Sequence, residues 1–472
     1  MFSRAFLICA LVGAVVSCDA RAAEPIRVHL KSGVLVGKLD SGVATYKGVP
    51  YAAPPVGPLR GALPRPFPPW SGERMADDFG FSCPQRATPR NVPPDSRAVQ
   101  LNDDCLTLNV WAPQGAHKAP VMVWIHGGGN EAGSSADSYT DGTEFARDGV
   151  VLVSLNYRLG AAGFQPHDGA ANFGLWDQVA ALGWVRDNAT AFGGDPANVT
   201  LFGESAGGQD TLVLMTAAPA RGLFQKAIVE SGGGGWEIHP TLEKAQSNPP
   251  GESEPVVDGH LLKEAPLAAF AAGRATPVPL IIGTNSEEGS LLRLDVHSAG
   301  LIPQVSKDDL ARLQKIYGSE AADDASLARL EFRDGYFTSE ARWIAAKVAA
   351  GGVPVYTYRF EYVLGALQGR RSGAYHGSEI PFVFDHFPPV PTSEDDRRVE
   401  RALHGCWVAF ARTGKPVCAD APGWPAFDVR DPKWMVFDAH PAAHPMGPVA
   451  ALDLLQCRLA DPAWVSGDCA AK

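Results

Sequence analysis

The stretch Val199-Thr-Leu-Phe-Gly-Glu-Ser205-Ala-Gly-Gly208 carries the strongest structural information in the chain. In it, a run of β-branched and aromatic residues leads directly into a G-x-S-x-G pentapeptide, and residues 209–217 can then form a helix. This order predicts a strand, a tight turn and a helix, with Gly203 and Gly207 at points where a Cβ would clash. Such a turn lifts the Ser205 hydroxyl out of the backbone at the start of the helix, so Ser205 is the candidate nucleophile.

A second glycine-rich segment matches the needs of a nucleophilic serine. When a hydroxyl attacks a carbonyl group, the oxyanion that forms needs hydrogen-bond donors aimed at it. The predicted strand 121–126 ends in Gly127-Gly128-Gly129, a form that exposes backbone N–H groups. A lone glycine triplet is more often a flexible turn, but the serine turn downstream favours the functional interpretation. The predicted donors are the N–H groups of Gly128, Gly129 and Ala206.

Short β-rich runs alternate with helical segments along most of the chain. This pattern is typical of an α/β protein whose large, mainly parallel central sheet has helices on both faces. The first runs predict an N-terminal antiparallel meander and the later ones core strands: 26–30, 34–38 and 43–47, then 106–111, 121–126, 150–155, 199–202 and 280–284. Helical spacing of apolar residues predicts a helix over 174–192. Polar or glycine-rich composition predicts surface loops at 232–235, 246–255 and 387–398.

Length, composition and charge limit the class of protein. The 472 residues are 45% apolar and 20% charged, which fits a globular chain. Large α/β folds often form one core, so residues 23–472 are predicted to be a single domain. The formal net charge is -11 and no polybasic run occurs, which disfavours nucleic acid and anionic membrane surfaces as partners.

The N-terminus has the features of an export signal. Arg4 supplies a positive charge, residues 5–16 are apolar and small residues follow, so residues 1–22 are predicted to be a signal peptide. The mature protein is then expected in the periplasm or outside the cell. Two processing sites remain open: Ala20-Arg21-Ala22 fits ordinary cleavage, whereas Val15-Val16-Ser17-Cys18 fits a lipobox that would place a lipid anchor on Cys18.

The cysteines also favour export. Of the 8 cysteines, Cys9 and Cys18 lie in the predicted signal peptide, and an even set follows: Cys83, Cys105, Cys406, Cys418, Cys457 and Cys469. An even number in an exported chain suggests disulfide bonds. No C-x-x-C or H-E-x-x-H motif is present, so neither a metal site nor another cofactor is predicted.

A serine nucleophile needs a base, and the base needs an orienting carboxylate. On this architecture the chain order is serine, acid, histidine. The residues alone leave several histidines open as the base: His297, His376, His386, His404, His440 and His444.

Ordered blocks over most of the chain resemble a known family, the type-B carboxylesterases of the α/β-hydrolase fold, whose relatives include the cholinesterases. The resemblance runs from about residue 26 to about residue 440 and includes the Ser205 turn. Its other blocks are Tyr46-Lys-Gly-Val-Pro-Tyr-Ala-Ala-Pro-Pro-Val-Gly57, Asp103-Asp-Cys-Leu-Thr-Leu-Asn-Val-Trp111, Asn156-Tyr-Arg-Leu-Gly160, residues 172–178, Phe192-Gly-Gly-Asp195 and Phe410-Ala-Arg-Thr-Gly-Lys-Pro416.

The resemblance selects the acid and the base. The family's acid is a Glu just before Gly, after a strand, which Glu288 matches, while Glu287 is left as a solvated charge. The family's base lies in a His-Gly-x-Glu-Ile-x-Phe block, which His376 begins. The implied catalytic triad is Ser205, Glu288 and His376.

Other positions are assigned by resemblance alone. Glu204 is similar to a second carboxylate near the base and Ser231 to a hydroxyl behind the triad, with a structural role as the alternative for both. Cys83 and Cys105 should form a disulfide, and the four later cysteines leave three pairings open. The resemblance also implies two buried ion pairs, Arg60 with Asp103 and Arg158 with Asp177.

The activity that the resemblance implies is hydrolysis of small-molecule esters through an acyl-enzyme on Ser205. His376 would accept the serine proton, Glu288 would stabilise the imidazolium, and water would release the acyl group. A triad does not choose its leaving group, so an amidase, lactonase or thioesterase is the alternative. A non-catalytic binding module of the same fold is a further alternative, which the presence of the whole triad disfavours. The oligomeric state does not follow from the sequence.

Three departures from the family pattern bear on specificity. Asn130 follows the glycine triplet, where the family usually has an apolar residue. Residues 84–104 contain no aromatic residue that could hold a quaternary ammonium group, which disfavours cholinesterase activity. Only a short stretch precedes Pro255-Val-Val-Asp-Gly259, where relatives have a longer helical segment, and this predicts a more open acyl site.

Overall fold

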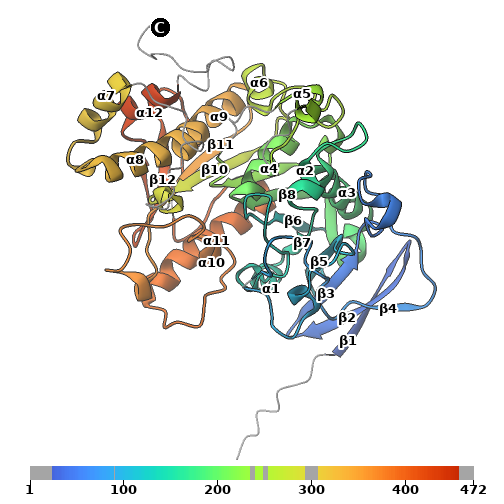
Figure 1. Cartoon of the computed structure of the whole chain (residues 1–472). Coiled ribbons are helices and arrows are strands. Elements are labelled where there is room, and N and C mark those ends of the chain that lie inside the picture. The colour runs from blue at the N-terminus through green and yellow to red at the C-terminus, as the bar shows by residue number, and fades with distance from the viewer. Residues whose placement is uncertain are drawn as a thin grey trace, which may run out of the picture.

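A mixed β-sheet forms the centre of the computed structural model, which describes residues 24–89, 91–233, 240–247, 253–292, 307–421 and 423–456. In these ranges the sheet has 13 strands in the order β1-β2-β3-β5-β7-β6-β8-β9-β10-β11-β12-β13, with β4 paired to β2 (Figure 1). The strands are β1 (Glu24–Leu30), β2 (Gly33–Asp40), β3 (Val43–Pro50), β4 (Glu73–Met75), β5 (Thr107–Pro113), β6 (Ala119–Ile125), β7 (Val151–Leu155), β8 (Gly194–Glu204), β9 (Lys226–Glu230), β10 (Leu280–Asn285), β11 (Val355–Phe360), β12 (Lys433–Phe437) and β13 (Ala442–Pro445).

The helices lie on both faces of this sheet. They are α1 (Thr143–Arg147), α2 (Gly160–Phe164), α3 (Phe173–Asn188), α4 (Ala206–Thr216), α5 (Leu242–Ser247), α6 (Pro266–Ala271), α7 (Lys307–Tyr317), α8 (Asp324–Phe332), α9 (Ser339–Ala350), α10 (Ile380–Val383), α11 (Glu394–Thr413) and α12 (Val449–Gln456). Short 3-10 turns are η1 (Gly57–Leu59), η2 (Arg97–Val99), η3 (Ser138–Thr140), η4 (Ala189–Phe192), η5 (Ala218–Ala220), η6 (Glu288–Leu291), η7 (Gly318–Glu320) and η9 (Gly365–Leu367), and η8 (Arg333–Thr338) is a π-helix.

Strand pairing agrees with the fold predicted from the sequence. Neighbouring strands pair antiparallel from β1 through β2, β3 and β5 to β7, which forms the N-terminal meander. The strands from β7 through β6, β8, β9, β10 and β11 to β12 pair in parallel. The chain is therefore an α/β protein with a mainly parallel centre, as predicted.

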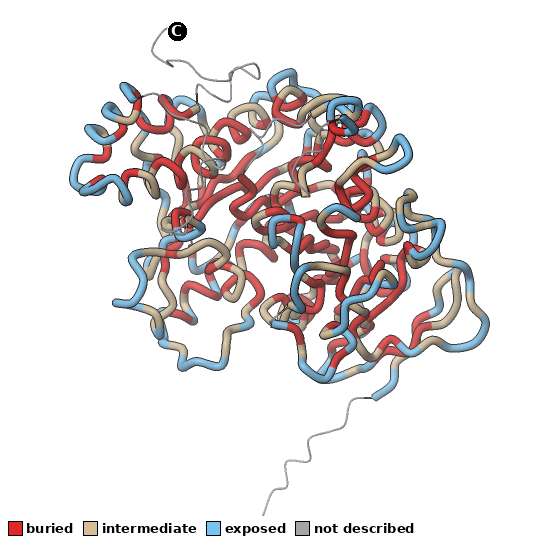
Figure 2. The backbone as a smooth tube through the Cα atoms, viewed as in Figure 1, coloured by how far each residue is buried: buried red, intermediate tan, exposed pale blue. Residues whose placement is uncertain are grey.

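Both faces of the central strands are apolar, which requires cover on both sides. On β6, Val121, Val123 and Ile125 enter one core cluster with residues of α3, α4 and α9. The alternate residues Met122 and Trp124 enter a second cluster with residues of α1, α10 and α11. Figure 2 shows the buried strands between the two helical layers. No helix in the described ranges is both long enough and apolar enough to cross a membrane.

Two loop predictions from the sequence are wrong in part. Residues 387–398 were expected to form a loop, but α11 begins at Glu394 because Ser393 and Asp396 cap it reciprocally. The Asp396 N–H donates to Ser393 Oγ at 3.0 Å and the Ser393 N–H donates to Asp396 Oδ2 at 2.6 Å. The predicted loop 246–255 begins inside α5, which extends to Ser247.

Two disulfides join cysteines of the described residues. Cys83 and Cys105 are bonded, as the family resemblance implied, and Cys406 is bonded to Cys418. Cys457 and Cys469 lie outside the described residues, as does the predicted signal peptide with Cys18. The Cys406–Cys418 bond joins α11 to the segment that follows it.

The two ion pairs differ in burial. Arg158 and Asp177 are 3% and 0% exposed, and the guanidinium donates two bonds of 2.7 Å to the carboxylate. Arg60 does pair with Asp103, but its side chain is 68% exposed, so the prediction of a buried pair is wrong there. The difference follows from position, because Arg60 lies directly after the exposed turn η1 whereas Asp177 lies on the core face of α3.

This contrast predicts different effects on stability. Asp177→Asn should lower the free energy of unfolding by about 3–5 kcal/mol, because it leaves the Arg158 charge buried without a counter-ion. Asp103→Asn is the matched control and should change it by roughly 0–1 kcal/mol, because water already solvates Arg60. Urea unfolding of the disulfide-bonded proteins measures both. Equal losses in the two variants would contradict the assignment.

Candidate active site

Ser205 occupies the turn between β8 and α4, in a backbone conformation with φ 57° and ψ -125°. A Cβ on Gly203 would lie 2.5 Å from the Gly207 backbone, and a Cβ on Gly207 would lie 2.0 Å from the carbonyl oxygen of Ile125. The two glycines are therefore required by close backbone approach. The Ser205 N–H donates to the carbonyl of Glu230 at 2.9 Å, which fixes the turn against β9.

The glycine triplet lies next to this turn because β6 and β8 are parallel neighbours. The chain leaves β6 for β7 on one side and returns to β8 on the other, so the loops after β6 and β8 meet at the carboxyl edge of the sheet. Gly128 and Gly129 have φ values of 107° and 66° and line the same cavity as Ser205 and Ala206. Among the residues that the structure describes, the N–H groups of Gly128 and Gly129 make no hydrogen bond to other backbone groups.

His376 and Glu288 form a close pair at the same edge. His376 Nδ1 lies 2.5 Å from Glu288 Oε2, and the Glu288 side chain is fully buried. The other oxygen, Glu288 Oε1, accepts hydrogen bonds from Ser231 Oγ at 2.6 Å and from the Asn285 N–H at 2.7 Å. Ser231 thus fixes the carboxylate that contacts the imidazole.

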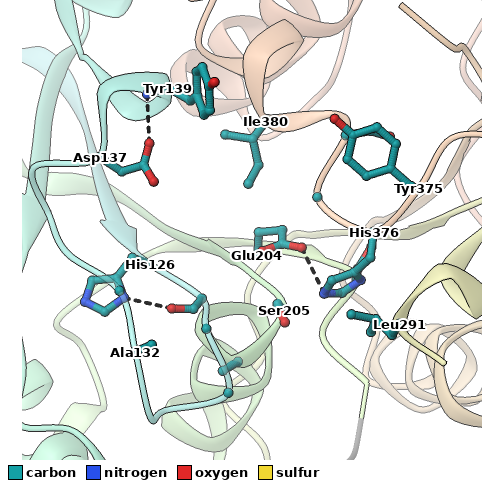
Figure 3. A pocket seen from close by; sticks show the side chains of 18 of the residues that line it. His126, Ala132, Asp137, Tyr139, Glu204, Ser205, Leu291, Tyr375, His376 and Ile380 are labelled. Carbon is teal, nitrogen blue, oxygen red and sulfur yellow. Dashed lines mark hydrogen bonds and ion pairs between the residues drawn. The ribbon is translucent and has the colours of Figure 1, made fainter. Parts of the chain in front are cut away.

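A second carboxylate contacts the other ring nitrogen of His376. Glu204 Oε1 lies 3.2 Å from His376 Nε2, and Figure 3 shows the Glu204 carboxylate turned toward the imidazole beside Ser205. No hydrogen bond joins Ser205 Oγ to His376 Nε2 among the described residues. Serine hydroxyls rotate between staggered positions, and catalytic hydrogen bonds often form only when substrate is bound.

The two carboxylates set the charge of the imidazole. Burial works to lower the pKa of His376, but Glu204 and Glu288 outweigh burial and raise it. Burial raises the pKa of Glu204, against the attraction of His376. The site therefore stabilises a protonated imidazole, which is the form that His376 takes after it accepts a proton from a serine.

Glu379 is a site residue that the sequence analysis did not single out. Its carboxylate accepts a hydrogen bond from Asn285 Nδ2, and the same amide donates to the carbonyl of Tyr375 at 2.9 Å. Burial, with Glu204 and Glu288 nearby, raises the pKa of Glu379. Its position three residues after His376 was the available sequence signal.

The site opens into a cavity of about 1020 Å³. One side is an aromatic wall made by Phe332, Tyr336 and Phe337, from the end of α8 and from the π-helix η8. The Phe337 ring lies 5.3 Å from the imidazole of His376, between ring centres. This wall could not be predicted from the sequence, because nothing in residues 332–337 indicates that their aromatic side chains face the same cavity as His376, which lies 40 positions after Tyr336.

The remaining candidate histidines lie elsewhere or outside the described residues. His404 is buried and its Nδ1 lies 2.7 Å from the carbonyl of Val383, while His386, His440 and His444 are exposed. His297 falls in the stretch 293–306, which is not described. Glu287 is half-buried and accepts a hydrogen bond from Ser372 Oγ at 3.2 Å. In the described part of the chain, no group of three or more His, Cys, Asp or Glu residues could hold a metal ion.

Removing the Glu204 charge is expected to move the pH profile. His376 acts as a base only when neutral, and Glu204 helps to raise its pKa. Glu204→Gln should therefore lower that pKa and shift the acid limb of kcat/KM to lower pH by about 1 unit. Glu287→Gln is the matched control. It removes the same charge from the residue next to Glu288, but the Glu287 carboxylate is bonded to Ser372 rather than to His376. pH-stat assays measure both, and an acid limb that stays in place in Glu204→Gln contradicts the prediction.

A serine turn at the carboxyl end of a central parallel strand, with a histidine and a buried glutamate beyond later strands, defines an α/β-hydrolase. Residues 24–247 and 236–449 match the sequence model of the carboxylesterase family. The chain belongs to the carboxylesterase family and is a carboxylic ester hydrolase.

Individual relatives agree with this assignment. The chain is 33% identical over 464 residues to fumonisin B1 esterase of Sphingopyxis macrogoltabida, covering 85% of this chain and 84% of the relative. It is 34% identical over 473 residues to para-nitrobenzyl esterase of Bacillus subtilis strain 168, covering 87% and 94%. The solved structure of Geobacillus stearothermophilus carboxylesterase EST55 at pH 6.2 is similar, with a TM-score of 0.79, 30% identity and coverage of 91% and 99%.

Proposed function

We propose that the protein is an exported serine esterase that forms an acyl-enzyme on Ser205, with His376 as base and Glu288 as orienting acid. One observation carries this proposal. The His376 imidazole is paired through Nδ1 with a buried carboxylate and lines the same cavity as Ser205 and the amides of Gly128 and Gly129. These are the groups that acyl transfer needs.

In the first step His376 Nε2 takes the Ser205 proton while Oγ attacks the ester carbonyl carbon. The N–H groups of Gly128, Gly129 and Ala206 bind the oxyanion, and the imidazolium then gives its proton to the departing alkoxide. In the second step water attacks the acyl group in the same way and regenerates Ser205. The Glu288 and Glu204 carboxylates stabilise the imidazolium in both steps.

The lining of the cavity supports an ester with a bulky apolar part. Phe332, Tyr336 and Phe337 form one side, and Leu364, Leu367 and other apolar residues lie on the cavity's wall as well. The residues behind the predicted open acyl site, 234–239 and 248–252, lie outside the described ranges. We therefore infer the substrate class from the described apolar residues of the cavity wall.

The test compares matched substrates. p-Nitrophenyl butyrate and p-nitrobutyranilide share an acyl group and differ in the atom that leaves. We expect the ester to be cleaved and the anilide to be inert. Cleavage of the anilide at a similar rate would favour an amidase, and failure of both substrates together with failure of a fluorophosphonate to label Ser205 would favour a binding module.

Export is proposed on two grounds. The sequence has a predicted signal peptide at 1–22, and the Cys83–Cys105 and Cys406–Cys418 disulfides suit an oxidising compartment. Fractionation of cells that express the full chain tests this. Labelling with radioactive palmitate, lost in Cys18→Ala, would identify a lipid-anchored form, whereas release of unlabelled protein would identify the freely diffusing one.

A further inference from the structure

Asn130 ends the loop that carries the predicted oxyanion donors, and its backbone is unusual. It has φ 56°, a left-handed conformation, and its side chain is 2% exposed. Gly127, Gly128, Gly129 and Glu131 all line the cavity, but Asn130 does not. Its carbonyl accepts the Gly160 N–H at 2.7 Å, so the residue is tied into the protein behind the loop.

The Asn130 side chain lies in the middle of a buried polar chain. Its amide nitrogen lies 3.1 Å from Asp210 Oδ1, and its amide oxygen lies 2.9 Å from the Tyr157 hydroxyl. The same hydroxyl lies 2.9 Å from the carbonyl oxygen of His126, the residue that begins the loop. Gln178 Nε2 donates to the other Asp210 oxygen. Tyr157 therefore contacts both ends of the segment 126–130.

A count of protons favours a neutral Asp210, because an ionised Asp210 leaves two acceptors to share one proton. The Tyr157 hydroxyl has one proton and faces two acceptors, the His126 carbonyl and the Asn130 amide oxygen. Exchanging the oxygen and nitrogen of the Asn130 amide, which keeps its shape, lets the amide donate to Tyr157 while Tyr157 donates to His126. The amide oxygen then faces Asp210, which must supply a proton. Every contact is satisfied when Asp210 is a neutral acid.

The surroundings of Asp210 favour the neutral form. It lies on α4 with 0% exposure, and among the described residues its hydrogen-bond partners are the amides of Asn130 and Gln178, with no Lys or Arg. Burial raises the pKa of Asp210 to about 7 even with the Asn130 amide nitrogen turned toward it, the orientation in which both Gln178 and Asn130 donate to the carboxylate and work to lower the pKa. Charged or titratable groups on the elements and loops packed around α4 include those on the sheet side and on α3: His126, Tyr157, Asp177, Arg186, Asp187, Asp195, Glu204, Lys226 and Glu230. On the other side of α4, the buried Glu340 of α9 lines a small cavity together with Gln209 and Leu212.

We propose that Asp210, as a neutral carboxylic acid, is a positioning residue for the oxyanion hole. Through Asn130 and Tyr157 it fixes the His126 carbonyl and with it the path of the loop that carries Gly128 and Gly129. This inference rests on the proposed function, because it assigns a task to the same site. The inference also explains why a polar residue, Asn130, follows the glycine triplet: its partner Asp210 lies 80 positions further along the chain.

Three variants test the kinetic part. Asp210→Asn keeps one donor for Asn130 and one acceptor for Gln178, so kcat should stay near the wild-type value. Asp210→Leu removes the donor and should lower kcat by about tenfold or more with little change in KM, because the oxyanion forms only in the transition state. Affinity for a trifluoromethyl ketone should fall in parallel. Thr211→Val is the control, since Thr211 is equally buried on α4 but bonds only to the helix carbonyl of Gly207.

A double-variant comparison separates positioning from general destabilisation. Tyr157→Phe breaks the same chain of hydrogen bonds at its other end. The double variant Asp210→Leu with Tyr157→Phe should therefore lose little more kcat than the more impaired single variant. Losses that multiply, or a KM that rises in place of a falling kcat, would overturn the proposal. Equal impairment of Asp210→Asn and Asp210→Leu would overturn it too.

Infrared spectroscopy tests the protonation state without any assay of activity. The carbonyl stretch of a protonated carboxylic acid is well separated from the bands of a carboxylate. At neutral pH the wild-type spectrum minus that of Asp210→Asn should contain this band, and its absence would overturn the neutral assignment. If the band is present but no ester is hydrolysed, the proposed function fails while the neutral Asp210 stands.

Discussion

Replacing Ser205 by alanine is expected to lower kcat/KM for p-nitrophenyl esters by about 10⁴- to 10⁶-fold, the range observed when a serine hydrolase loses its nucleophile. The alanine variant has no oxygen to form the acyl-enzyme, so only direct attack by water remains. The oxyanion donors and the cavity are retained, and they account for the residual rate above that in free solution. The expected loss of kcat/KM therefore measures the contribution of the route through the acyl-enzyme.

The measurement must separate loss of chemistry from loss of folding. Ser339→Ala is a suitable control, because Ser339 is fully buried, its hydroxyl donates to the carbonyl of Gly335, and neither of these two residues lines the cavity. Both variants should unfold near the wild-type urea midpoint. A fluorophosphonate should add its mass to the wild type and to Ser339→Ala, but not to Ser205→Ala. A Ser205→Ala protein that keeps more than about a tenth of the activity would exclude the acyl-enzyme on Ser205.

The sequence predicted the central part of the fold because its signals there are local. Residues 199–217 alone predict strand β8, the turn and α4. The turn depends on Gly203 and Gly207, where the close backbone contacts leave no room for a Cβ. Strands β4, β9, β11, β12 and β13 were not predicted. They are short, and β9 is buried along its whole length, so the polar and apolar alternation that identifies a half-exposed strand is missing.

The site was predictable only as far as the family resemblance extends. His376 and Glu288 are 88 positions apart, and nothing in either local sequence distinguishes this histidine from five others. The Asn130–Asp210 contact likewise depends on the packing of α4 under the glycine loop. The exposure of Arg60 was missed for the same reason, since a pairing pattern does not report how much water reaches the pair.

Replacing Glu288 by glutamine is expected to lower kcat/KM by about 10³- to 10⁴-fold, comparable with loss of the orienting carboxylate in other triads. The hydrogen bonds around this residue determine how the new amide must lie. Ser231 Oγ and the Asn285 N–H both donate to Glu288 Oε1, so the amide oxygen of glutamine stays at that position. The amide nitrogen then faces His376 Nδ1 and donates to it. The imidazole proton is forced onto Nε2, which can no longer accept the proton of Ser205.

Glu204→Gln is the informative comparison, because Glu204 contacts the same imidazole at Nε2, 3.2 Å away, and not at Nδ1. Glu204→Gln also removes one negative charge at a similar distance from the His376 ring. Glu288 is still present in this variant and keeps the imidazole proton on Nδ1. We therefore expect a loss of kcat/KM at least about tenfold smaller than that of Glu288→Gln, together with its shift in the acid limb. Initial rates across the pH range measure both effects. A larger loss of kcat/KM in Glu204→Gln than in Glu288→Gln would contradict the prediction. Glu204 would then be the orienting carboxylate, although it contacts Nε2 and not Nδ1.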